Sequence, residues 1–228
     1  MKIFKLTLLV VCLALLTTGL IACSKNSSGS AQSSVSAADL LKKLPANALG
    51  FAVFNLQDPG LLKTFQSPAY NNMMNSLQGA GAADPKTAQG MKTYYDFMDA
   101  IGFMPKGEAS SMQAADSLVF AVPKQDHSVD LAAYYSTVAG VDARTLLNNA
   151  KAALGRANIS SEVLNGNGYE AITFKPLASI EGDNQVAAVY RDGLGIDAVY
   201  LGASEKVFAM STSKELLERS FTAVNDES

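Results

Sequence analysis

The chain has 228 residues with 48% hydrophobic and 17% charged side chains, and its formal net charge is −3. This mild acidity argues against nucleic-acid binding and against a basic face for lipid headgroups. His127 is the only histidine and there are two cysteines, which disfavours a zinc site with several nitrogen or sulfur ligands, and no cofactor is expected.

Residues 1–22 are predicted to be an export signal. Lys2 and Lys5 precede an apolar run from Leu6 to Ala22, and the small residue Ala22 stands before Cys23. A basic start, an apolar middle and a small residue at the cleavage point are typical of a removable signal peptide. The alternatives are an ordinary secretory signal and an uncleaved single-span anchor, for which the apolar run is at the short limit.

Leu20-Ile21-Ala22-Cys23 resembles the lipobox of bacterial lipoproteins. The resemblance implies that Cys23 receives a diacylglycerol by thioether, that residues 1–22 are removed, and that fatty acids such as palmitate acylate the new amino terminus. The membrane would then be a partner through the lipid on Cys23. Ser24 follows, and by resemblance to diderm lipoproteins the absence of aspartate there implies the periplasmic face of the outer membrane. In a monoderm host the location would be the outer face of the plasma membrane.

Processing would leave 16 of the 18 basic residues against 21 acidic ones, a net charge of −5. Cys12 would leave with the signal and the lipid would occupy Cys23, so no thiol would remain. A folded part without disulfides must be held together by its core. Residues 23–36 are predicted to be the lipidated cysteine and a flexible tether, because they are rich in serine and other polar residues. Residues 37–228 are predicted to form a single domain.

The folded part opens with a helix, a strand and a second helix start. Ser36 can cap a helix over residues 37–43, and residues 48–56 form a strand that is apolar on both faces for most of its length. Asp58-Pro59 then provides a capping carboxylate and a proline for the first turn of a helix.

Residues 70–102 are predicted to be a helical hairpin rich in methionine. Apolar residues recur at helical spacing on both sides of the glycine-rich stretch 79–83, and they include the methionines Met73, Met74, Met91 and Met98. One interpretation is that these side chains pack against the sheet. A second is an adaptable binding face for a partner protein of the envelope or for lipid, because methionine is flexible and polarisable. Thioether binding of copper is a third.

The second half of the chain has the alternation of strands and turns. Strands are expected at 118–122, 129–138, 161–164, 169–174, 185–191, 196–201 and 207–210, with helices from Asp142 to about 157 and from 212 to 221. Asn165-Gly166-Asn167-Gly168 is a strong hairpin signal. The pattern predicts an α+β fold, with a mainly antiparallel sheet, helices on one face and the inserted helical hairpin.

Two local patterns have competing interpretations. Residues 49–53 and 118–122 match at four of five positions. The match indicates either an internal duplication or a chance similarity, because apolar strands draw on few residue types. Ser211-Thr212-Ser213-Lys214 fits the Ser-x-x-Lys motif of penicillin-recognising serine enzymes. A hydrolase using Ser211 and Lys214 is therefore the alternative function, although serine and threonine are also ordinary residues at a helix start.

The mature chain resembles a family of uncharacterised bacterial envelope proteins carrying a domain of unknown function. The similarity lies in the Leu-Pro-Ala opening and apolar strand of residues 44–56, the helix announced by Asp142, the glycine-rich hairpin into Tyr169, and the strand-to-helix segment 207–217. Family members are often longer, which implies that this chain is one unit of a repeated arrangement. The resemblance assigns no catalytic residue. The sequence therefore predicts a lipid-anchored envelope protein of non-enzymatic, binding or scaffolding type.

Overall fold

The computed structural model describes residues 34–65, 67–69, 72, 113–125, 128–175 and 197–222. The strands in these ranges are β1 (Gly50–Asn55), β2 (Ala114–Pro123), β3 (Val129–Thr137), β4 (Ser161–Asn165), β5 (Glu170–Phe174), β6 (Val199–Ala203) and β7 (Val207–Ser211). The helices are α2 (Ala37–Leu41), α3 (Pro59–Phe65), α6 (Ala143–Arg156) and α8 (Lys214–Phe221).

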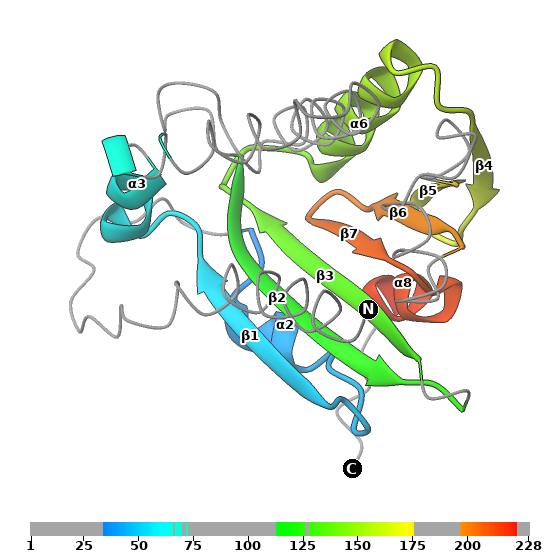
Figure 1. Ribbon diagram of the computed structural model, residues 1–228, viewed down its shortest axis with the longest axis horizontal. Coiled ribbons are helices and arrows are strands. Elements are labelled where there is room, and N and C mark those ends of the chain that lie inside the picture. Colours follow the sequence, from blue (N-terminus) through cyan, green and yellow to red (C-terminus); the bar gives the residue numbers. More distant parts are fainter. Residues whose placement is uncertain are drawn as a thin grey trace.

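The strands form one seven-stranded sheet in the order β1-β2-β3-β7-β6-β5-β4. Every neighbouring pair is antiparallel, so the predicted α+β class with an antiparallel sheet is confirmed. The two halves of the chain meet where β3 pairs with β7 in the middle of the sheet, and β1 and β4 form its two outer edges (Figure 1).

Helices cover both faces of the sheet, whereas the sequence analysis placed them on one face. The side chains of α6 belong to one buried cluster, and those of α2 and α8 belong to another on the opposite face. The reason is visible in β3, where Tyr134 and Tyr135 point to opposite faces and are both buried. Strands that are apolar on successive positions need a cover on each side.

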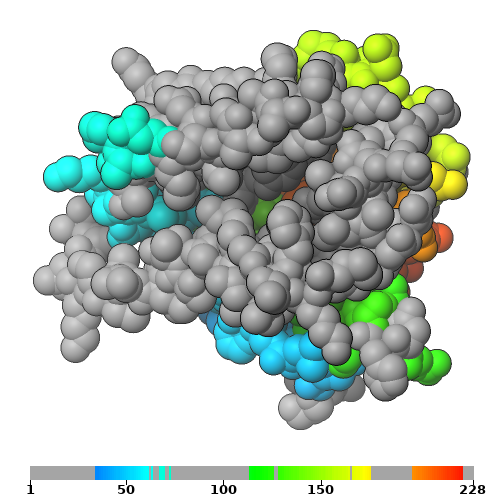
Figure 2. All heavy atoms as spheres, in the orientation of Figure 1, coloured from blue at the N-terminus to red at the C-terminus, as the bar shows by residue number. Residues whose placement is uncertain are grey.

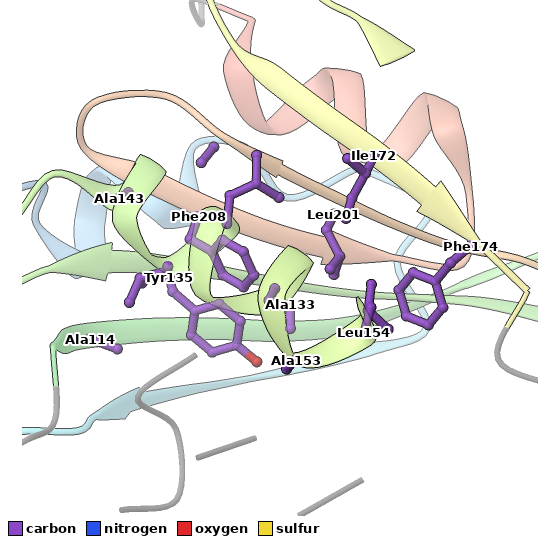
Figure 3. Close-up of a cluster of buried hydrophobic side chains, with 14 of the residues drawn as sticks. Ala114, Ala133, Tyr135, Ala143, Ala153, Leu154, Ile172, Phe174, Leu201 and Phe208 are labelled. Atoms are coloured by element: carbon purple, nitrogen blue, oxygen red, sulfur yellow. The ribbon is translucent and has the colours of Figure 1, made fainter. Parts of the chain in front are cut away.

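The cluster under α6 fills one side of the sheet. Leu146, Leu147, Ala150 and Leu154 are buried on one stripe of the helix, as their spacing predicts. Figure 3 shows residues of this helix, such as Ala153 and Leu154, beside aromatic and aliphatic side chains from the strands, including Phe208 and Leu201. We call this side the α6 face.

The opposite side, which we call the α2/α8 face, combines apolar packing with hydrogen bonds between the ends of the two helices. Phe120 and Tyr134 meet edge to face with ring centroids 5.0 Å apart, and the Tyr134 hydroxyl donates to the Leu216 carbonyl (2.5 Å). Burial of this phenol raises its pKa. The Arg219 guanidinium donates to the Lys43 carbonyl (2.8 Å).

The Lys43 ammonium in turn donates to the Thr222 carbonyl (2.9 Å). Burial of the Lys43 ammonium lowers its pKa, and the nearby positive charge of Arg219 lowers it further. The carboxyl ends of α2 and α8 are therefore joined reciprocally, which satisfies carbonyls that have no partner within their own helices.

Local sequence signals explain most element boundaries. Asp142 caps α6 by accepting from the Arg144 amide (2.9 Å), and Asp58 accepts from the Gly60 and Leu61 amides at the start of α3. At α8 the N-cap is Ser213, one residue after position 212, where the sequence predicts that this helix begins. The Thr212 hydroxyl instead accepts a hydrogen bond from the Leu131 amide of β3 (2.9 Å). This side chain therefore binds the strand and does not cap the helix.

The predicted hairpin between β4 and β5 is confirmed by the pairing of Asn165 with Glu170. Beyond its turn, the Tyr169 ring stacks on Phe221 of α8, with centroids 4.3 Å apart and an interplanar angle of 15°. A Cβ added to Gly166 would lie 2.3 Å from the Tyr169 ring. The glycine therefore makes room for the aromatic pair that attaches this hairpin to α8.

Ser34, the first residue that the structure describes, lies inside the stretch predicted as tether and already contacts the sheet. The Ser34 amide donates to the Thr137 carbonyl at the end of β3 (2.8 Å), and its hydroxyl donates to the Lys206 carbonyl (3.1 Å). Val35 packs against the cluster of the α2/α8 face. The chain thus enters the domain beside the two central strands and on the α2/α8 side.

Candidate binding edge

Several predicted site residues lie outside the described ranges. These are the lipidation residue and the methionines of the helical hairpin: Cys23, Met73, Met74, Met91 and Met98. His127 and the hairpin itself are also outside. Lipidation and the methionine binding face therefore stay predictions. Within the described part of the chain, no helix is long and apolar enough to cross a membrane.

Ser211 is buried at the end of β7 rather than placed at the helix start. Its hydroxyl donates to the Leu131 carbonyl (3.1 Å) and accepts from the Ser213 amide (3.0 Å). Lys214 is exposed and its ammonium lies 3.5 Å from the Glu218 carboxylate along α8. These contacts favour a structural role for Ser211, with its hydroxyl occupied by the backbone, and a solvated ion pair for Lys214.

No group of three or more His, Cys, Asp and Glu side chains comes together among the residues that the structure describes. The feature that stands out is instead the outer strand β1.

Strand β1 exposes large apolar side chains at the rim of the sheet. Phe51 is 58% exposed and Val53 is 37% exposed, and Leu49, just before the strand, is 65% exposed. Phe51 and Val53 lie on the α2/α8 face, because they pair with Phe120 and Leu118 of that cluster. In the space-filling view, the light-blue atoms of this region reach the surface along the lower edge of the molecule (Figure 2).

The backbone of β1 also presents free hydrogen-bonding groups. The Leu56 amide donates to the Ala115 carbonyl (2.7 Å), in step with the β1–β2 register. Amide and carbonyl directions alternate along an antiparallel strand. The backbone amide and carbonyl groups of Ala52 and Phe54 therefore point toward β2. Those of Phe51 and Val53 point away from β2, toward the open side of the strand. Among the described residues, no strand pairs with this outer side.

The chemistry of β1 contrasts with the usual protection of an edge strand. Natural edges commonly carry a charge, a proline or a bulge, which prevent pairing with another chain. Residues 50–55 have none of these in their regular register with β2. At the other edge, β4 carries the exposed carboxylate Glu162 next to its exposed Val163. Of the two edges, β1 is the one whose composition permits strand addition.

The apolar pattern of residues 48–56 predicts the strand but not its exposure. A continuous apolar run is compatible with a buried strand, so composition alone does not reveal an edge. Residues 49–53 and 118–122, which resemble each other in sequence, pair with Phe51 opposite Phe120. Their similarity does not distinguish the edge strand from the interior one. No family model, curated protein or solved structure matches this chain.

Proposed function

We propose that this protein is a lipid-anchored, non-enzymatic component of the bacterial cell envelope that binds or scaffolds through the edge of β1. The observation that carries the proposal is an uncharged outer strand with outward backbone groups at Phe51 and Val53 and with exposed apolar side chains at the same positions. An extended segment that joins such an edge gains main-chain hydrogen bonds and contacts for alternate side chains.

Anchoring would come from Cys23, and the tether would set the working distance from the membrane. Among the residues that the structure describes, the first with contacts to the sheet is Ser34, eleven positions after Cys23. A flexible segment of that length has a root-mean-square reach of about 17–20 Å. The domain would therefore work close to the headgroups, where its partners would be proteins of the envelope.

A photo-crosslinking amino acid at Phe51 tests the proposal in intact cells. The control carries the same amino acid at Glu162, which is exposed on the opposite edge. We expect ultraviolet light to produce a defined protein adduct from position 51 in the membrane fraction and none from position 162. If both positions gave the same diffuse labelling, or position 51 gave none, binding through β1 would be wrong.

A further inference from the structure

We infer that the partner of the β1 edge is a second copy of this chain, so that two sheets join into one continuous sheet across β1. This inference rests on the proposed function, because it names the partner of the same edge. Three observations support it. Two concern the strand, namely the symmetry of its outward residues and its lack of charge, and the third is the side on which the tether enters the domain.

The outward-pointing residues are self-complementary around Ala52. If two β1 strands pair antiparallel with Ala52 opposite Ala52, Phe51 of one copy lies opposite Val53 of the other. Both residues point their amide and carbonyl groups outward, so each pair can exchange both hydrogen bonds of a regular antiparallel ladder. Their side chains lie on the α2/α8 face and would cover one another across the two-fold axis.

The charge of the strand permits this pairing. Gly50–Asn55 has no ionisable side chain, so no like charges come opposite each other when the strand meets its own copy. Like charges directly opposite across a ladder destabilise it. The predicted mature chain has a net charge of −5, so two copies repel each other overall. An uncharged strand is a place where they can meet without bringing like charges together.

The entry point of the chain agrees with two copies in one membrane. The two-fold axis of an antiparallel strand pair stands perpendicular to the sheet, so the α2/α8 faces of both copies lie on the same side. Val35 packs on that face and Ser34 is bound at the end of β3. Both tethers would therefore leave toward the same side, as two anchors in one bilayer require.

A pair of six-residue strands is a small contact, and small interfaces form weak complexes. Confinement of both copies to one membrane raises their effective concentration and can compensate. The experiment therefore uses the full lipidated chain, purified and reconstituted in phosphatidylethanolamine–phosphatidylglycerol vesicles.

Disulfide trapping tests the register. In a non-hydrogen-bonded antiparallel pair the Cα atoms are about 4.5 Å apart, which is within the range that a disulfide spans. We expect Ala52→Cys to form a disulfide-linked dimer on mild oxidation. Val163→Cys is the matched control, because that position is 74% exposed on the other edge and would react more readily if the crosslinks came from random collisions.

Adding Val53→Lys to Ala52→Cys should remove most of the trapped dimer, since it places a charge against Phe51 of the other copy. Circular dichroism would show that both variants stay folded. The inference is overturned if Ala52→Cys dimerises no more than Val163→Cys, or if Val53→Lys has no effect. An adduct from position 51 with the mass of a different protein would also overturn it, while the proposed binding through β1 would stand.

Discussion

Phe51 and Phe120 lie directly opposite each other across β1 and β2, yet Phe51 is 58% exposed and Phe120 is 2% exposed. The two side chains are on the same face of the sheet, and both are phenylalanine within a similar five-residue segment. What separates them is one strand position. Phe120 has a strand on each side and packs against Tyr134, whereas Phe51 has, among the described strands, a neighbour on one side only.

This difference predicts unequal effects on stability. Phe120→Ala removes a buried ring and should lower the free energy of unfolding by about 3–5 kcal/mol. Phe51→Ala should cost less than about 1 kcal/mol in the isolated, unlipidated chain, because most of the ring is already in water. Urea unfolding at low protein concentration measures both. Equal losses would mean that Phe51 is covered in solution.

The glycine under the Tyr169 ring gives a second prediction. Gly166→Ala should push the ring out of its stack on Phe221 and destabilise the protein by about 1–3 kcal/mol, as overpacking does. Gly155→Ala is the control, because a Cβ there meets no atom within 4 Å, and alanine in α6 should stabilise by about 0.5–1 kcal/mol. The chain has no tryptophan, so near-ultraviolet circular dichroism reports the tyrosine environment directly.

The cap of α6 should make stability depend on pH. The side-chain hydrogen bonds from Arg144 lower the pKa of Asp142 below its usual value. A carboxylate with a lowered folded-state pKa stabilises fully above its unfolded pKa of about 3.9, and this stabilisation disappears as the pH falls through the folded value.

Asp142→Asn keeps a capping side chain but cannot titrate, so its unfolding free energy should fall less between pH 5 and pH 2 than that of the unaltered chain. Asp142→Ala should lose about 0.5–2 kcal/mol at neutral pH, the usual cost of removing a helix cap. Thermal unfolding across this pH series distinguishes the cap from its charge. Identical pH profiles for Asp142→Asn and the unaltered chain would contradict the assignment.

The environment of Ser211 predicts a stability effect without catalysis. Ser211→Ala removes the hydrogen bonds to the Leu131 carbonyl and the Ser213 amide and should cost about 1 kcal/mol. Lys214→Ala removes an exposed ion pair and should change stability by less than about 0.5 kcal/mol. A fluorescent serine-reactive probe should leave Ser211 unlabelled, and stoichiometric labelling there would revive the hydrolase alternative.

The predicted anchor at Cys23 gives a prediction about processing. Cys23→Ser should block lipidation and leave an unprocessed precursor, because the thioether acceptor is gone. Electrophoretic mobility and mass spectrometry of the membrane fraction measure both effects. A variant that is trimmed to normal size and stays membrane-bound would contradict the lipobox assignment.

Local features of this fold could be predicted from sequence because their causes are local. Asp58, Asp142 and the Gly166 turn each act within a few residues, and their elements begin or turn where the pattern indicates. The apolar stripe of α6 is likewise a property of one helix. These signals need no knowledge of the rest of the chain.

The arrangement of the elements could not be predicted in the same way. Nothing near β3 indicates that it pairs with β7, and the choice of a different face for α6 and for α8 depends on that pairing. The apolar run of β1 suits an interior strand as well as an edge. Exposure at Phe51 thus follows from the order of strands, which is set by contacts distant in sequence.

The reciprocal bonds between Lys43 and the end of α8 have a consequence for biogenesis. Arg219 and its acceptor at Lys43 are 176 positions apart. The central pair of the sheet also forms only after β7 has been synthesised, because β3 pairs with β7. Non-local contacts of this kind slow folding, because the loop between them must close first. A nascent chain that ends before β7 has neither its central strand pair nor the α8 part of its α2/α8 face. For a chain predicted to be exported through a narrow translocation channel, this topology would delay compaction until β7 and α8 have been synthesised, so the preceding part of the precursor would stay extended enough to pass through the channel.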